Sequence, residues 1–409
     1  GQEGRRFVVP SHSSFCTMAE FQLEVYALLL LATTTVATCC VYIPVPLHML
    51  IASMVTIFVG SMGALRASDK KVVEDSKVSA ALGSKDVHRM SRSDVYASPI
   101  IGSAVLFGLY IVYKFCPKDY VNILVKLYFG IFGVFSIGEQ VGFFIMSFFI
   151  ESQATKKVQW LHRKLLSIPY LETDVTALDA IGCLAGSVIG GWYLLKNHWV
   201  ANNIFGVAFS LQAIRMLSIG SYFNGTILLS GLFVYDIFWV FGTDVMVTVA
   251  KSFDGPIKLL FPRWIQDDKT GKWMSSILGL GDIVLPGIFI ALLLRFDRYR
   301  LSELNRVGGG EKTTQCHHRS SSGLWKYKYF CWAMGGYALG LAITIAVMNA
   351  FNAAQPALLY LVPCCIGASI VKAVMEGELK ELWNYEEKDE GDTDPDSGKQ
   401  INSGKAHSE

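Results

Sequence analysis

Charge is what this sequence has least of. Only 17% of its 409 residues are charged, whereas ordinary soluble domains carry about 25%. The formal net charge is +2, and no basic stripe lies on a polar domain, so nothing favours a nucleic-acid partner. By contrast, 52% of the residues are hydrophobic, and many of them form long runs. The scarcity of charge and the length of these runs predict a protein that crosses a membrane several times.

The sequence also lacks the cysteine spacing of a metal site or a disulfide framework. Its nine cysteines are scattered and lie mostly inside apolar runs. Cysteines in such positions usually act as small hydrophobic side chains in helix packing. We therefore expect no metal and no other cofactor.

Nine apolar segments have the length of a transmembrane helix, about 17–25 residues. They predict an all-α polytopic membrane protein with spans at 46–66, 98–115, 121–146, 177–195, 199–216, 227–249, 276–294, 329–350 and 356–375. A further apolar stretch from Val25 to Tyr42 lies in the N-terminal region, 1–45. This stretch suits both the core of a signal peptide and an extra helix.

The spans divide the rest of the chain into five regions. Residues 46–216 hold the first five spans, 217–297 hold the sixth and seventh with a luminal loop, 298–328 form a cytosolic loop, 329–375 hold the last two spans, and 376–409 form a tail. The tail is acidic and polar, so we expect it to be disordered in the cytosol. The basic loops after the first, third and seventh spans fall on one face, against one dissenting basic loop at 251–273, and predict a luminal N-terminus and a cytosolic C-terminus.

One carboxylate stands in the middle of the sixth span. Asp236 follows Tyr235 in a run that is otherwise apolar from about Ile227 to Phe241. An ionisable side chain at bilayer depth costs roughly 2.5–3.5 kcal/mol on insertion scales, so an acid that is kept there usually has a function.

A second acid, Asp282, opens the seventh span. Two consecutive helices that each carry one buried aspartate can bring the two carboxyl groups together. Two such carboxylates cannot both ionise cheaply, so the pair holds a single proton. The ionised member can then take a proton from water while the protonated member polarises a carbonyl group. This is the chemistry of an aspartic protease inside a membrane.

The neighbours of the two acids suit an unwound, water-accessible site. Gly279 and Gly281, on either side of Leu280, allow close backbone approach just ahead of Asp282. Tyr235 is a candidate hydrogen-bond partner or pocket wall. A third element starts the last span and could offer main-chain groups to an extended substrate; its residues are Gln355, Pro356, Ala357 and Leu358.

Three short motifs in this chain resemble the signatures of the presenilin-type intramembrane aspartyl proteases. They are Tyr235-Asp236 in the sixth span, Gly279-Leu280-Gly281-Asp282 in the seventh and Pro356-Ala357-Leu358 in the ninth. Within that family the longer context is similar to the signal peptide peptidase branch, over roughly residues 96–385. The context includes Trp192 to Trp199 and Phe241 to Phe253.

The resemblance implies a specific function. It implies an endoplasmic reticulum protease with Asp236 and Asp282 as catalytic aspartates, which cuts within the membrane spans of signal peptides and type II-oriented proteins. It also implies independence from metals and from the accessory subunits of presenilin. The bilayer is the working environment, and homo-oligomerisation or quality-control partners in the endoplasmic reticulum are conceivable.

Two other classes of function are compatible with intramembrane acids. An ion-coupled transporter would use them as a proton relay or ion site, but it predicts internal inverted repeats, and the two halves of this sequence lack such symmetry. A non-proteolytic scaffold of the endoplasmic reticulum is the third class. Cleavage of a model signal peptide separates the protease from both alternatives.

Overall fold

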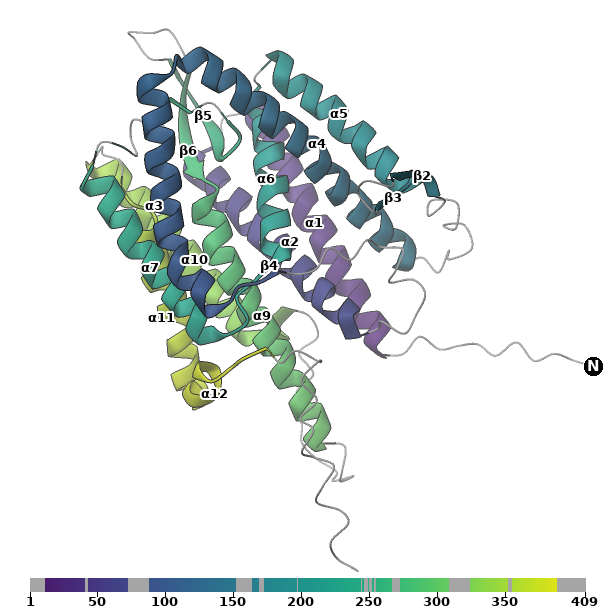
Figure 1. The fold of residues 1–409 in the computed structure, drawn as a ribbon. Helices are drawn as coiled ribbons and strands as arrows, with labels where there is room; N and C mark the ends of the chain where they lie inside the picture. The colour runs from purple at the N-terminus through teal and green to yellow at the C-terminus, as the bar shows by residue number, and fades with distance from the viewer. Residues whose placement is uncertain are drawn as a thin grey trace, which may run out of the picture.

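The computed structural model describes residues 12–40, 43–72, 88–151, 164–168, 173–196, 198–243, 255–266, 273–308, 324–351 and 355–387, with positions 245, 249, 252 and 253. The described part is a bundle of long helices (Figure 1). These are α1 (His12–Cys40), α2 (Val45–Val72), α3 (Arg92–Phe115), α4 (Lys118–Glu151), α5 (Ala177–Lys196), α6 (Trp199–Met216), α7 (Tyr222–Phe241), α9 (Gly281–Gly308), α10 (Lys328–Phe351) and α11 (Leu358–Glu376). A short helix, α12 (Leu379–Trp383), and a 3-10 turn at Leu324–Lys326 complete the helical set.

Three two-stranded sheets accompany the helices. β1 (His88–Arg89) pairs in parallel with β4 (Leu217–Ser218), and β2 (Lys164–Ile168) pairs antiparallel with β3 (Thr173–Thr176). The largest is an antiparallel hairpin of β5 (Lys258–Gln266) and β6 (Trp273–Gly279), with Lys258 opposite Gly279. In Figure 1 this hairpin lies at one end of the bundle, and β6 runs from it into α9.

Each of the nine predicted spans contains a helix, so the helical membrane fold is confirmed. By length and composition alone, six of the described helices are long and apolar enough to cross a membrane: α2, α3, α4, α7, α10 and α11. A count of nine crossings remains a prediction.

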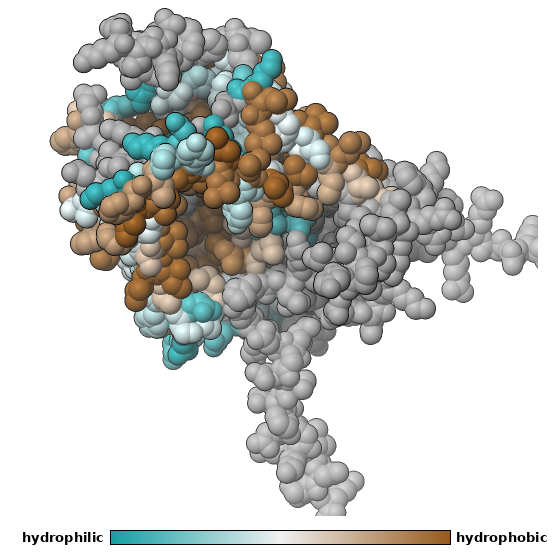
Figure 2. All heavy atoms as spheres, turned by 45° about the horizontal axis from the view of Figure 1, so that its top comes forward, coloured by the Kyte–Doolittle hydropathy of each residue, from teal (hydrophilic) through white to brown (hydrophobic). Residues whose placement is uncertain are grey.

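The outer helices direct apolar side chains away from the bundle. On α3 and α4, Ile100, Val105, Leu124 and Phe132 are all more than half exposed. Figure 2 shows wide apolar areas on the surface of the molecule between hydrophilic patches. In water such an apolar surface would drive association. In a membrane it faces the apolar lipid chains, where it is stable.

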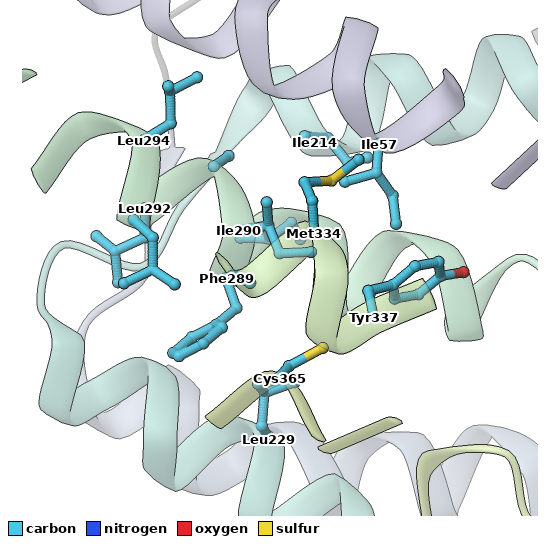
Figure 3. Close-up of a cluster of buried hydrophobic side chains, with 14 of the residues drawn as sticks. Ile57, Ile214, Leu229, Phe289, Ile290, Leu292, Leu294, Met334, Tyr337 and Cys365 are labelled. Carbon is cyan, nitrogen blue, oxygen red and sulfur yellow. The ribbon is translucent and has the colours of Figure 1, made fainter. Parts of the chain in front are cut away.

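α9 is the central helix of the bundle. All side chains from Ile288 to Leu294 are at most 1% exposed. Around this segment lie α2, α6, α7, α10 and α11, and Figure 3 shows Phe289, Ile290 and Leu292 among side chains from these neighbours. A helix that is apolar all round is expected in such a position. The first turn of α9 is less covered than this segment, since Gly281 is exposed and Asp282 is half-buried.

Three predicted boundaries are wrong. The sixth span was expected to continue to 249, but α7 ends at Phe241, where Gly242 closes the last turn onto Phe238. The seventh span was expected to begin at 276, but 273–279 form strand β6 because they pair with β5, and the helix begins at Gly281. It then continues to Gly308, so the predicted loop 298–328 is helical in its first part.

The tail prediction also needs correction, because residues 376–387 are ordered. Leu382 of α12 is fully buried, and Glu387 forms an ion pair with Arg295 of α9 and accepts a hydrogen bond from Ser218. The main chain of Glu387 donates to the carbonyl of Gly220, just ahead of α7. Residues 388–409 lie outside the described part.

The N-terminal apolar segment forms helix α1, which packs on α2. Glu24 is fully buried, and its carboxylate accepts two hydrogen bonds from Arg66 of α2, at 2.7 and 3.0 Å. Thr38 and His48 contact each other at the other end, 3.1 Å apart. The choice between a signal-peptide core and an extra helix stays a prediction.

The Glu24–Arg66 pair should stabilise the docking of α1. We expect Glu24→Ala to lower the free energy of unfolding by roughly 3–5 kcal/mol, because it leaves a guanidinium group in the bundle without this partner. The measurement is thermal unfolding in detergent. The double variant Glu24→Leu, Arg66→Met should recover most of the loss, and Tyr26→Phe, on the exposed side of α1, is the control. Equal melting of Glu24→Ala and the parent would contradict the prediction.

Candidate active site

Asp236 lies on the buried face of α7. The helix starts at the N-cap Ser221, whose side chain accepts a hydrogen bond from the amide of Asn224, 3.2 Å away. From there the buried positions recur every three or four residues and include Gly225, Leu229, Leu232, Asp236 and Trp239. This helical spacing turns the acid toward the interior, where its side chain is only 6% exposed.

The carboxylate of Asp236 meets the N-terminus of α11. Its Oδ2 accepts a hydrogen bond from the main-chain amide of Leu358, at 3.1 Å. Ala357 is the N-cap residue of α11 and makes no side-chain cap, so this amide is one of the free donors of a helix start. A carboxylate at this end also complements the helix dipole. The predicted Pro356-Ala357-Leu358 element is thus in direct contact with Asp236.

Asp282 lies in the first turn of α9, directly after β6. Its carboxylate accepts a hydrogen bond from the main chain of Gly279. A Cβ atom at Gly279 would lie 3.2 Å from Asp282 Oδ2, so a side chain at this position would crowd the acid. The chain turns from strand to helix within two residues, Leu280 and Gly281.

Asp236 and Asp282 lie on two helices that pack together. α7 and α9 pack together, and a Cβ atom at Gly225 of α7 would lie 3.0 Å from the ring of Phe289. At the other end of this interface the charge of Asp236 reaches Asp282. Two carboxyl groups that are desolvated and within electrostatic reach of each other favour a single shared proton.

The remaining predicted residues shape the surroundings. The ring of Tyr235 points to α3, where a Cβ atom at Gly102 would lie 3.6 Å from it, and it also packs beside Trp239. Its position is that of a wall between α7 and α3. Leu280 packs against Gly206 of α6. Gln355 is half-buried and directly precedes Pro356, whose carbonyl accepts from the amide of Leu359.

Two asparagines of α6 hold the β5–β6 hairpin and were missed by sequence reasoning. Asn203 donates to the carbonyl of Leu260 and accepts from its amide, both at 2.8 Å, as a neighbouring strand would. Asn202 donates to the carbonyl of Lys258 at 2.7 Å. Adjacent asparagines in an apolar span are the signal that could have found this contact, because a buried amide needs partners.

A metal site has no support among the described residues. No group of three or more histidine, cysteine, aspartate or glutamate side chains is close enough there to hold an ion. Each of the two acids accepts a hydrogen bond from a main-chain group.

Comparison with known proteins assigns the chain to a family. The model of the signal peptide peptidase family matches residues 83–389, which include both acids and the start of α11. The chain belongs to the signal peptide peptidase family.

Relatives in the signal peptide peptidase family extend over most of the chain. Human signal peptide peptidase is 39% identical over 345 residues, which cover 83% of this chain and 82% of that protein. Intramembrane protease 2 of Caenorhabditis elegans is 48% identical over 234 residues, 57% of this chain and 47% of that protein. A solved presenilin family intramembrane aspartate protease aligns with a TM-score of 0.42 and 16% identity, over 81% of this chain and 96% of that one.

The contact between Gly279 and Asp282 leads to a prediction. We expect Gly279→Ala to reduce proteolysis of a signal peptide about tenfold or more, because the added methyl group displaces the Asp282 carboxylate from its main-chain donor. Gly335→Ala is the matched control, since a Cβ atom there meets nothing within 4 Å. Turnover is measured on purified protein, with thermal unfolding to confirm folding. Equal activity of the two variants would count against the contact.

Proposed function

We infer that this protein is an aspartic endopeptidase that hydrolyses peptide bonds within membrane-spanning segments. The observation that carries this inference is the approach of Asp236 and Asp282 on two packed helices, each acid held by a main-chain amide. Family membership supports the same activity.

The reaction follows from one proton shared by two carboxyl groups. The ionised carboxylate takes a proton from water, and the water oxygen forms a bond to the carbonyl carbon of the substrate. The protonated carboxyl group donates its proton to the carbonyl oxygen. Collapse of the tetrahedral intermediate breaks the C–N bond. The leaving amine takes up the proton that came from water, and a hydroxyl of the intermediate returns its proton to the other carboxylate as the new carboxyl group forms. The pair ends with one proton, as it began.

The amide of Leu358 gives Asp236 a defined role in this scheme. A hydrogen bond from a main-chain donor fixes the orientation of the carboxylate and stabilises its ionised form. The donor is a main-chain amide at the start of α11, so its position is fixed by the helix and does not depend on the rotamer of a side chain. We therefore assign the Pro356-Ala357-Leu358 element to the positioning of Asp236.

The free edge of β6 suits an extended substrate. β5 uses its outer edge for the asparagines of α6, while β6 pairs only with β5 among the described strands. β6 leads directly into Asp282, so a peptide added to its open edge would run toward the two acids. Addition of a strand to an exposed sheet edge is a common mode of peptide recognition. It also suits hydrolysis, because a peptide bond inside a helix is shielded from water.

The family and the basic loops support a proposal for the substrates and the location. We propose signal peptides and type II-oriented membrane proteins as substrates, in the endoplasmic reticulum membrane. The basic loops support a luminal N-terminus and a cytosolic C-terminus, which protease protection of a C-terminal epitope would test. Self-association and quality-control partners are secondary proposals, to be tested by crosslinking in native membranes.

The activity is tested by removing one carboxylate at a time. We expect Asp236→Asn and Asp282→Asn each to reduce cleavage of a synthetic signal peptide by at least about 100-fold, because the acid–base exchange needs both groups. The substitutions keep the shape of the side chain, so thermal unfolding should change little. Glu139→Gln, at an acid of α4 that contacts Gln212, is the control and should cleave normally. Wild-type activity of either aspartate variant would exclude the proposed reaction.

Substrate choice provides a separate test of unwinding. A span with glycine or serine near the cut should be cleaved faster than a polyleucine span of equal length, because it loses less helix stability on opening. The comparison uses initial rates with both peptides in the same detergent or bilayer. Equal rates would contradict the requirement for an extended substrate.

A further inference from the structure

The segment 385–387, which we call the C-terminal strap, binds the two helices that carry the acids. It follows α12, whose Leu382 is fully buried. Figure 1 shows the chain after α12 running to α9, at the end of the bundle opposite the β5–β6 hairpin. The strap has no part in the reaction described above, so its close docking calls for a reason.

The strap pairs with the start of α7 as a short antiparallel strand. The amide of Tyr222 donates to the carbonyl of Tyr385 at 3.2 Å. The amide of Glu387 donates to the carbonyl of Gly220 at 2.8 Å. Between these two hydrogen bonds the chains form an antiparallel bridge. Two main-chain bonds in this pattern define one register, so the first turn of α7 is fixed relative to the strap.

The same segment is bound to α9 by a buried ion pair. Arg295 is only 7% exposed, and its Nε donates to the carboxylate of Glu387. Ser218, just ahead of α7, joins the pair, since its hydroxyl donates to Glu387 at 2.8 Å and accepts from Arg295 at 3.2 Å. The ring of Tyr385 packs on Phe296 with the centroids 5.0 Å apart. The strap therefore holds the start of α7 against α9.

The strap lies at a similar distance along the helices from both acids. Asp236 lies about 21 Å along α7 from Tyr222, and Asp282 about 20 Å along α9 from Arg295, at a rise of about 1.5 Å per residue. Because α7 and α9 pack together, their axial register at the strap sets the relative height of the two carboxyl groups. A slip by one residue would move one acid past the other by about 1.5 Å. A misplacement of about 1 Å can cost about 100-fold in rate.

A buried ion pair is better suited to fixing a register than to adding stability. The desolvation of two charges offsets much of their attraction, and apolar side chains of similar volume often stabilise a protein as well or better. The best attested use of buried polar groups is the selection of one register among several. The pair between Arg295 and Glu387 has this character, because it follows directly after the apolar segment Ile288 to Leu294 of α9.

We propose that Arg295 and Glu387 are positioning residues, which set the register of α7 against α9 and thereby the approach of Asp236 to Asp282. The proposal rests on the proteolytic function inferred above. The pair acts on the geometry of the two acids and not on the bound peptide. The rate of the chemical step should therefore depend on it, whereas substrate affinity should not.

The first test replaces the pair by apolar side chains. In the double variant Arg295→Met, Glu387→Leu we expect kcat for a signal peptide to fall about tenfold with little change in KM, because the register is no longer specified. Thermal stability in detergent should stay equal or rise, because no charge is left buried without a partner. A parental kcat in this variant would overturn the proposal.

A second ion pair of α9 provides the matched control. Arg300 pairs with Glu378, which lies between α11 and α12 and does not contact α7. The double variant Arg300→Met, Glu378→Leu should keep the parental kcat. Equal losses of kcat in the two double variants, accompanied by equal losses of stability, would show a general structural role and would also overturn the proposal.

Charge reversal tests the pairing itself. Glu387→Arg places two guanidinium groups against each other and should lower kcat, whereas the addition of Arg295→Glu restores an ion pair between the same positions and should recover most of it. No recovery in the reversed pair would speak against positioning by this contact. Cleavage by Asp282→Asn would refute the proposed reaction itself. An inactive Asp282→Asn together with a fully active apolar pair would refute only the role of Arg295 and Glu387.

Discussion

Lipid offers no hydrogen-bond donors, so every acid inside this bundle depends on a donor that the protein provides. For Asp236 that donor is the amide of Leu358, and for Asp282 it is the main chain of Gly279. Both donors belong to places where the backbone is irregular, a helix start and the end of a strand. Non-helical backbone at membrane depth is tolerated only inside protein. The surrounding helices thus serve to enclose two short irregular segments.

The position of α9 follows from the same constraint. Asp282 stands at the start of a helix whose apolar side chains from Ile288 to Leu294 are covered by five neighbours. If α9 lay at the edge of the bundle, both β6 and the strand-to-helix turn would face lipid with unpaired main-chain groups. In the structure α9 instead packs against α2, α6, α7, α10 and α11, and β6 pairs with β5. Close approach at Gly225, Gly336 and Gly340 makes this packing possible.

Sequence reasoning found the acids because a carboxylate in an apolar run is conspicuous. It also found the helical segments, whose length and hydropathy are local properties of the chain. It missed what depends on partners distant in sequence. Residues 276–279 are apolar enough to extend a helix, and only pairing with β5 makes them a strand. The hydrogen bonds from Asn202 and Asn203 to β5 join residues more than fifty positions apart. Glu387, in an acidic tail that resembles a disordered one, is ordered by Arg295 and Ser218.

The asymmetry of the hairpin connects these features to proteolysis in a membrane. An enzyme of this kind must offer backbone groups to its substrate while hiding them from lipid. In β5 the carbonyl of Lys258 and both the amide and the carbonyl of Leu260 are bonded to asparagine side chains of α6. Those of the open edge of β6 can exchange a temporary partner for a peptide strand, with no net loss of hydrogen bonds. A substrate helix that unwinds there would trade its internal bonds for bonds to β6, which lowers the cost of opening a peptide bond beside Asp282.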